Sequence, residues 1–237
     1  MDESEGGPTR FTRAGALRGA RAMLPLLPSA VAFGLLYGFL ATERGMTRLE
    51  VTLSSALVCA GSAQFLAMEL WAWPLPVPAL AAAVLVVNLR HVLMGPVLLP
   101  WLRDLPPAKT YASLFVMTDQ SWGASVAELR RGGRDAAFLA GAGGVLWVAW
   151  VAASLAGTLA GDVSGFVERW GLGFLTAAFY VALLAGFWRG RGDLMPWLVA
   201  AGVALVAREL VPGAWYILAG ALAGSAAGAL RDARAPR

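Results

Sequence analysis

Stretches of about 20 mostly apolar residues follow one another along almost the whole chain, and this is the length that an α-helix needs to cross the ~30 Å hydrocarbon core of a bilayer. Eight such stretches are present, at about residues 23–42, 51–73, 77–101, 109–127, 136–160, 166–188, 194–210 and 212–230. Apolar residues make up 58% of the 237 residues and charged residues only 14%. A soluble globule of this size cannot bury so much apolar surface. The sequence therefore predicts an all-α, polytopic membrane helix bundle of about eight spans.

Basic residues predict how the spans are oriented. The arginines that precede the first span are Arg10, Arg13, Arg18 and Arg21. The positive-inside rule places such a segment in the cytoplasm. With eight crossings, the loop that holds Arg103 and Lys109 falls on the opposite side, and an even number of crossings keeps the C-terminal arginines inside. We expect a cytoplasmic segment at 1–22, one transmembrane domain at 23–230 and a cytoplasmic tail at 231–237.

Polar residues occupy the middle of the second, third and fourth spans, where a charged group costs about 2.5–3.5 kcal/mol on insertion scales. They are Gln64 in the second span, Asn88, Arg90 and His91 in the third, and Asp119 and Gln120 in the fourth. By their position in each span, the three clusters reach a similar depth. Such residues persist in membranes where they are paired, solvated or used in transport.

Each of these residues has a structural and a functional interpretation. Arg90 and Asp119 can form an ion pair that only supports the fold, or Arg90 can hold a carboxylate while Asp119 faces an ammonium group or carries a coupled proton. His91 is either a hydrogen-bonded core residue or a proton relay. Gln64 is either an interhelical hydrogen-bonding residue or a substrate contact. Asn88 shares a helix face with His91 but not with Arg90.

Several glycines and a proline predict breaks and close helix contacts. Gly61 before Gln64, and the pair Gly95–Pro96 after His91 in the third span, are the predicted positions of a kink or break. Spans two and four carry polar residues at mid-span, so they are candidates for broken or re-entrant helices. Small-residue stripes that allow close helix packing are Gly34 and Gly38 in the first span, and Gly220, Gly224 and Gly228 in the last. Their neighbour is either another helix of this chain or a partner.

Motifs of enzymes and of nucleic-acid binding proteins are missing from this sequence. His91 is the sole histidine, so no HExxH metal site exists, and no phosphate-binding glycine loop is present. The arginines lie between apolar blocks rather than on one basic face, which argues against nucleic acid despite the net charge of +4. We expect no enzymatic activity, no metal and no cofactor.

Four segments carry a family resemblance. They are FGLLYG at 33–38, SSALVCAGSAQF at 54–65, VNLRHVLM at 87–94 and TDQSW at 118–122. Together they resemble the AzlC-type azaleucine-resistance family of branched-chain amino acid exporters. The resemblance implies a large permease subunit in the inner membrane and a small AzlD-type partner subunit of about four spans. It also implies export of leucine, isoleucine, valine and often methionine, driven by the proton-motive force.

One residue departs from the pattern of this family, in which an acidic residue commonly follows the aspartate of the fourth span. Here that position is Gln120, which places more weight on Asp119. The sequence predicts a proton-coupled exporter in which Arg90, helped by Asn88 and Gln64, binds the carboxylate of an apolar amino acid. Asp119 binds its ammonium group or the proton, and His91 is a second proton-coupling candidate. The alternatives are a membrane scaffold that does not transport, or an uptake permease or channel of the same fold.

Overall fold

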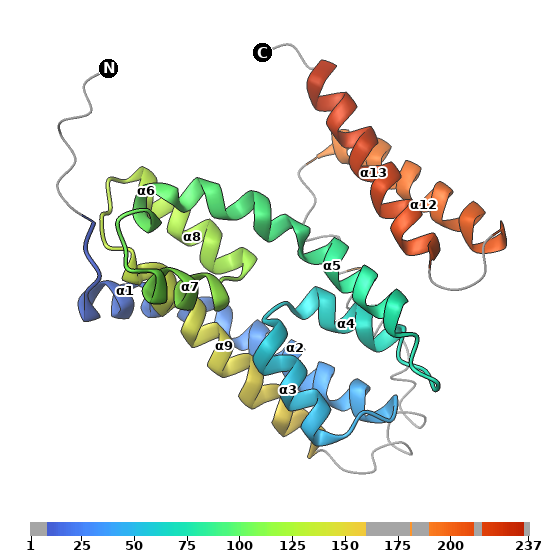
Figure 1. Ribbon diagram of the computed structural model, residues 1–237, viewed down its shortest axis with the longest axis horizontal. Coiled ribbons are helices and arrows are strands. Elements are labelled where there is room, and N and C mark those ends of the chain that lie inside the picture. The colour runs from blue at the N-terminus through green and yellow to red at the C-terminus, as the bar shows by residue number, and fades with distance from the viewer. Residues whose placement is uncertain (1–8, 160–180, 182–189, 211–214, 235–237) are drawn as a thin grey trace. The chain divides into compact units, whose positions relative to one another are not determined.

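The computed structural model describes residues 9–159, 181, 190–210 and 215–234 (Figure 1). These residues form helices and no β-strand, which confirms the all-α class. The chain divides into two compact units, one of residues 1–69 and 87–161 and the other of residues 70–86 and 162–237. The predicted sixth span, at 166–188, lies outside the described residues apart from Val181.

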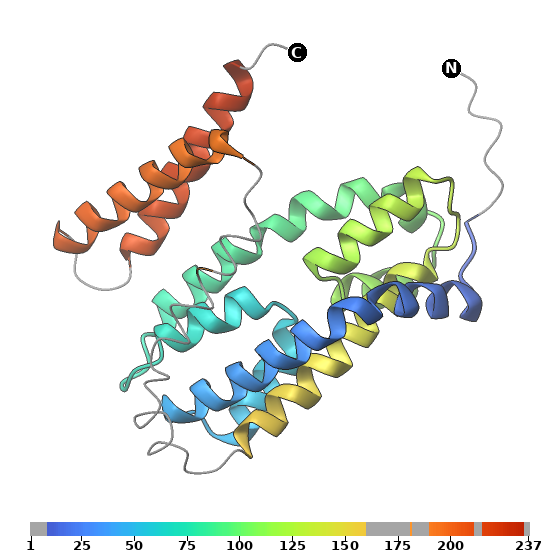
Figure 2. The same cartoon turned by 180° about the vertical axis from the view of Figure 1, so that it is seen from behind.

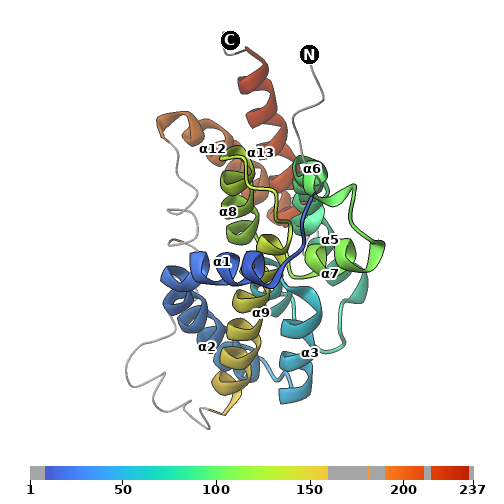
Figure 3. The same ribbon diagram turned by 90° about the vertical axis from the view of Figure 1, so that its left-hand side faces the viewer.

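Three helical stretches of the described chain are long and apolar enough to cross a membrane. The first joins α1 (Arg13–Met23) to α2 (Leu27–Glu43), the second joins α5 (Val77–Met94) to α6 (Leu99–Leu102), and the third is α9 (Ala137–Thr158). Figure 2 and Figure 3 show that the first stretch bends between α1 and α2. Prolines in and after the 3-10 turn at Leu24–Leu26 explain the bend, because proline has no N–H to donate.

Glycines allow the first stretch to pack closely along α9, in the same direction. Gly19 touches the carbonyl of Phe138, and Gly38 touches the carbonyl of Ser154. A Cβ at Gly34 would lie 2.8 Å from the Cβ of Ala153, so alanine does not fit without a shift. The predicted stripe of the first span therefore faces a helix of this chain.

The predicted second span is broken into two half-helices, α3 (Arg48–Val58) and α4 (Gly61–Glu69). Cys59 ends α3 in the left-handed conformation, with φ of 49°, which reverses the chain before Gly61 starts α4. The end of α4 returns to the start of α3, because Arg44 and Glu69 form a salt bridge of 3.2 Å. An 11-residue helix is about 16 Å long, half of a bilayer core. We call α3–α4 the first hairpin, and it is re-entrant.

The predicted fourth span is broken in the same way, into α7 (Pro107–Phe115) and α8 (Asp119–Arg130). The start of α7 lies by the N-terminal segment, with the Lys109 ammonium 5.0 Å from the ring centroid of Phe11. The end of α8 lies there too, because Glu128 pairs with Arg18 at 3.8 Å. We call α7–α8 the second hairpin, and it is also re-entrant.

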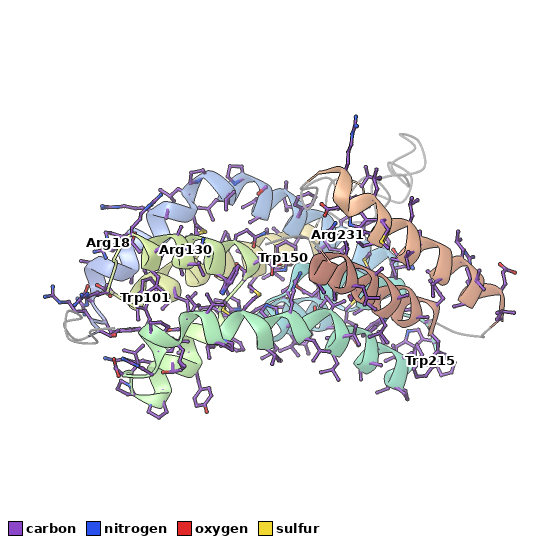
Figure 4. The ribbon with its side chains drawn as sticks, turned by 90° about the horizontal axis from the view of Figure 1, so that it is seen from above. Arg18, Trp101, Arg130, Trp150, Trp215 and Arg231 are labelled. Carbon is purple, nitrogen blue, oxygen red and sulfur yellow. The ribbon has the colours of Figure 1, made fainter. Side chains whose placement is uncertain are left out.

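The two hairpins enter the first unit from opposite ends. The N-terminal end holds Trp101, whose indole donates a 2.7 Å hydrogen bond to the carbonyl of Gly133. Figure 4 shows Arg18, Trp101 and Arg130 gathered at this end, away from Trp150. The opposite end holds Arg44 and Glu69. The re-entrant alternative predicted for spans two and four is therefore the one adopted.

This arrangement corrects one part of the predicted topology. The loop with Arg103 and Lys109 was placed opposite the N-terminus, and that placement is wrong, because Lys109 lies on Phe11 and Thr9 donates to the carbonyl of Pro100. The physical reason is that a hairpin which returns to its own side adds no crossing. Removing spans two and four together takes two crossings from the predicted eight, so the prediction of an even number is unchanged.

At Gly95–Pro96, the predicted position of a kink or break, the α-helix changes to a 3-10 turn without a gap. Residues Gly95–Leu98 tighten into a 3-10 turn that links α5 directly to α6. By contrast, the break near Gly61 is complete, although it falls at Cys59 and Ala60 and leaves Gly61 as the first residue of α4.

The second unit contains an antiparallel pair, α12 (Leu194–Leu210) and α13 (Trp215–Arg234) (Figure 1). The stripe of the last span faces α12, because a Cβ at Gly224 would lie 2.7 Å from that of Ala200. Arg231 and Asp193 form an ion pair of 3.5 Å near the start of α12. The neighbour of this stripe is again within the chain.

Candidate functional site

The centre of the first unit is the guanidinium of Arg90, close to the midpoint of the α5–α6 stretch. Its Nη1 forms a salt bridge of 2.9 Å with Oδ2 of Asp119, and its Nη2 donates a 2.9 Å hydrogen bond to Oγ of Ser62. Ser62 lies at the tip of the first hairpin and Asp119 at the tip of the second. Arg90 therefore joins the two tips, and of the residues predicted to share one depth, Arg90 and Asp119 are in contact.

Both contacts to Arg90 come from the first turn of a half-helix. The N-cap of α8 is Thr118, whose hydroxyl accepts from the N–H of Ser121 while the Ser121 hydroxyl accepts from the N–H of Thr118. This reciprocal cap fixes Asp119 as the first residue of the helix. A helix N-terminus carries a partial positive charge of about half a unit. Asp119 lies at such an end, and its carboxylate also faces the Arg90 guanidinium.

Two polar atoms at the centre of the unit are buried without a hydrogen-bond partner among the described residues. They are Nε of Arg90 and Oδ1 of Asn88. An unpaired buried polar group costs about 1–3 kcal/mol, so such atoms in a membrane protein need a reason. The Nε–Nη2 edge of a guanidinium matches a carboxylate bidentately. On Arg90 the Nε–H is unpaired within the described chain, while Nη1 holds Asp119 and Nη2 donates to Ser62.

His91 and Asn88 lie one helical turn apart, as predicted. Nδ1 of His91 lies 3.2 Å from the backbone carbonyl of Asn88. This is the contact of a hydrogen-bonded core histidine, and it does not connect the ring to Asp119. The role of His91 in proton coupling stays a prediction.

Gln64 lies in a second polar cluster rather than on Arg90. Its Oε1 accepts a 2.9 Å hydrogen bond from the indole of Trp150, and its Nε2 donates to Ser55 at 3.0 Å and to Ser54 at 3.3 Å. The Tyr37 hydroxyl lies 2.7 Å from that of Ser54. Only 2% of Gln64 is exposed. Four helices, α2, α3, α4 and α9, meet at this amide.

Sequence reasoning missed Ser62 as a partner of Arg90 and Trp150 as a partner of Gln64. Trp150 lies inside the predicted fifth span. One signal was available for it, since the N–H of a tryptophan at mid-membrane depth needs an acceptor. No feature of the sequence distinguishes Ser62 from the other serines of this chain as a partner of Arg90. Among the residues that the structure describes, no group of three or more His, Cys, Asp or Glu gathers to hold a metal ion.

The chain is similar to known membrane proteins. Residues 25–163 match the family described as AzlC protein. The inner membrane protein YgaZ of Escherichia coli is 29% identical over 217 residues, which cover 88% of this chain and 87% of that protein. An uncharacterized membrane protein of Archaeoglobus fulgidus is 27% identical over 206 residues, covering 84% of this chain and 88% of the relative. No solved structure matches the chain.

The family match begins just before α2 and extends past the end of α9, so it includes both hairpins and the α5–α6 stretch. It therefore covers Arg90 and its two polar partners among the described residues, Ser62 and Asp119. The chain belongs to the AzlC family, and it is a multi-pass membrane protein with the transporter-type role of that family.

Proposed function

We propose that this protein exports branched-chain or related apolar amino acids, namely leucine, isoleucine, valine and methionine, across the inner membrane. The observation that carries the proposal is the Arg90–Asp119 pair, held at 2.9 Å between the tips of two re-entrant hairpins. Such half-helix tips are where transporters place substrate sites, since their backbone groups are free to bind ligands.

The charges of this pair complement those of a zwitterionic amino acid. The carboxylate of the substrate binds the Nε–Nη2 edge of Arg90, next to the Ser62 hydroxyl and the N-terminus of α4. The ammonium group binds Asp119. Asn88 adds an unpaired buried oxygen, which accepts a hydrogen bond from a ligand or water.

Proton coupling follows from competition for one carboxylate. The ammonium group requires Asp119 to be ionised, so a proton that reaches Asp119 from outside displaces the amino acid and returns inward. This exchange is export driven by the proton-motive force. Gln120 stands beside Asp119 without a charge, so a single carboxylate carries the coupling here.

The two hairpins supply a route to alternating access. Because they enter from opposite ends, each tip can separate the centre from one side of the membrane. When the second hairpin withdraws, Asp119 leaves Arg90 and faces its ligand. When it returns, the ion pair reforms and the site closes.

Charge at the two ends of the first unit supports a cytoplasmic N-terminus. Two basic residues lie at the opposite end, Arg44 and Arg48. Nine lie at the N-terminal end: Arg10, Arg13, Arg18, Arg21, Arg103, Lys109, Arg130, Arg131 and Arg134. The positive-inside rule assigns the richer end to the cytoplasm. With an even number of crossings the C-terminus lies there too, and we propose a small AzlD-type subunit of about four spans as partner.

Export from intact cells tests this function. A host without its own branched-chain exporters is loaded with a leucine- or valine-containing dipeptide, with this chain alone, with its small partner, or with neither. We expect faster release of leucine and valine that needs the partner and stops with an uncoupler. Unchanged release from cells in which the chain is correctly inserted would favour a scaffold, and accelerated entry would favour an uptake permease.

A further inference from the structure

The Gln64 amide has its hydrogen-bonding groups engaged by protein. An indole N–H can only donate, so the oxygen of Gln64 must face Trp150 and its NH2 group must face the two serines. The Ser54 hydroxyl in turn donates to the carbonyl of Val51. With its oxygen and both N–H groups occupied and 2% of the residue exposed, Gln64 is a poor ligand for a passing substrate.

Gln64 is nevertheless close in sequence to Ser62, the residue of α4 that contacts Arg90. It lies two residues after Ser62 on α4, about 200° around the helix. Ser62 therefore lies on the face of α4 that contacts Arg90, and Gln64 lies on the opposite face, where it bonds to α3 and α9. Any rotation of this half-helix moves both side chains together.

Trp150 also supports the first turn of α4 by direct packing. A Cβ built on Gly61 would lie 2.7 Å from Cη2 of Trp150, so the indole rests against the backbone there. Its ring stacks with that of Tyr37 at a centroid distance of 6.4 Å. One turn earlier on α9, the Trp147 indole donates 3.0 Å to the carbonyl of Ala56, near the end of α3. The two tryptophans hold both sides of the break.

We infer that Gln64 and Trp150 are positioning residues of the transport site. They contact no substrate and act through the first turn of α4, which they hold so that the Ser62 hydroxyl meets Nη2 of Arg90. This inference rests on the proposed function. It reassigns Gln64 from substrate binding to the orientation of Ser62 and, through it, of the Arg90 guanidinium.

Transport kinetics of reconstituted protein test this role. Trp150→Phe removes the indole donor and keeps an aromatic ring, and Trp101→Phe is the matched control, because it removes one indole hydrogen bond at the N-terminal end. Ser55→Ala is a milder variant that removes one acceptor of the Gln64 amide. A hydrogen bond to a charged group is worth about 1.5–3 kcal/mol, so loss of the Ser62–Arg90 contact raises KM on the order of tenfold. We expect Ser62→Ala and Trp150→Phe to raise the KM for leucine, with Vmax nearly unchanged, and Trp101→Phe to leave KM alone.

The double variant separates positioning from general destabilisation. If Trp150 acts through Ser62, then Trp150→Phe has no further effect on KM in a Ser62→Ala background, while it lowers the melting temperature equally in both backgrounds. Equal increases in KM in both backgrounds would overturn the inference. So would an unchanged KM in Trp150→Phe.

A labelling readout keeps this inference separable from the proposed function. In a Cys59→Ser background, the rate at which a charged thiol reagent modifies Ser62→Cys reports the placement of the α4 tip. We expect Trp150→Phe to change this rate by severalfold and Trp101→Phe to leave it constant. A changed rate in a protein that moves no amino acid would refute the function and keep the positioning role. An unchanged rate in a protein that transports would refute the positioning role.

Discussion

The substitution Asp119→Asn gives the sharpest separation between a substrate site and a structural ion pair. It removes the carboxylate charge that faces Arg90 at 2.9 Å and keeps the size of the side chain. Breaking a fully buried pair costs about 3–5 kcal/mol. Breaking an exposed pair costs about 0–1 kcal/mol. The side chains of Arg90 and Asp119 are 30% and 34% exposed, so we expect an intermediate loss of about 1–3 kcal/mol.

That loss leaves most of the protein folded. For a chain of this size, 1 kcal/mol lowers the melting temperature by about 2–4 °C. We therefore expect Asp119→Asn to melt about 2–12 °C lower, to insert normally, and to lose amino acid transport altogether. The assay is uptake of radiolabelled leucine into proteoliposomes, with melting followed on the same preparations.

Asp104→Asn is the matched control for this substitution. Asp104 pairs with Arg103 at 3.7 Å, and both side chains are mostly exposed, so neither stability nor transport should change. Transport by Asp119→Asn at the wild-type rate would remove this carboxylate from the mechanism. Loss of transport only in proportion to loss of folded protein would assign the pair a structural role.

Four further predictions follow from particular contacts. Arg90→Lys keeps the positive charge but has no second N–H edge, so leucine uptake should fall by at least tenfold while the protein stays folded. In a Cys59→Ser background, Ala108→Cys and Arg131→Cys should react with an impermeant thiol reagent added to one side of the membrane, and Arg48→Cys should react only with reagent added to the other side. With eight crossings, Ala108→Cys and Arg48→Cys would instead react from the same side. Gly143→Ala should lower the melting temperature, since Gly143 touches the carbonyl of Val116 at the break of the second hairpin, and Gly144→Ala should be neutral or stabilising by up to about 1 kcal/mol, because it faces open space. Hydrogen bonds from Thr47 lower the pKa of Glu50 below 4.5, so the Glu50 charge stabilises the helix cap above pH 4.5, and this stabilisation is lost as the pH falls through the lowered pKa. The difference in melting temperature between wild type and Glu50→Gln should therefore shrink as the pH is lowered. A difference that stays constant with pH would contradict this.

The polar residues in the middle of predicted spans allowed the position of the candidate site to be predicted from the sequence. Burying Arg90 or Asp119 in lipid is so costly that their common depth could be read from span positions alone. The same argument marked spans two and four as irregular, and both are broken. Glycine spacing likewise anticipated that Gly34 and Gly38 lie on a helix interface.

The return of each hairpin to its own side was not readable from hydropathy. Residues 51–73 and 109–127 are long enough to cross, and the turn at Cys59 depends on a left-handed residue that is not glycine. The residues that pack against the break between α3 and α4 are distant in sequence, since Trp147 and Trp150 lie about 90 residues after it. The sequence left open whether Gln64 helps Arg90 bind a substrate or forms interhelical hydrogen bonds, and the structure shows Gln64 bonded to α3 and α9 while Ser62 contacts Arg90.

The central claim is that an amino acid binds where the two hairpin tips meet Arg90, and protection from labelling tests it most directly. Gln120 is exposed and adjacent to Asp119, so Gln120→Cys in a Cys59→Ser background reports on the site, and Ala127→Cys, two turns further along α8, is the control. The proposed site predicts that leucine slows modification at position 120 and not at position 127, and that Asp119→Asn abolishes the protection. Equal modification rates at position 120 with and without saturating leucine, in a protein that transports leucine, would place the substrate elsewhere.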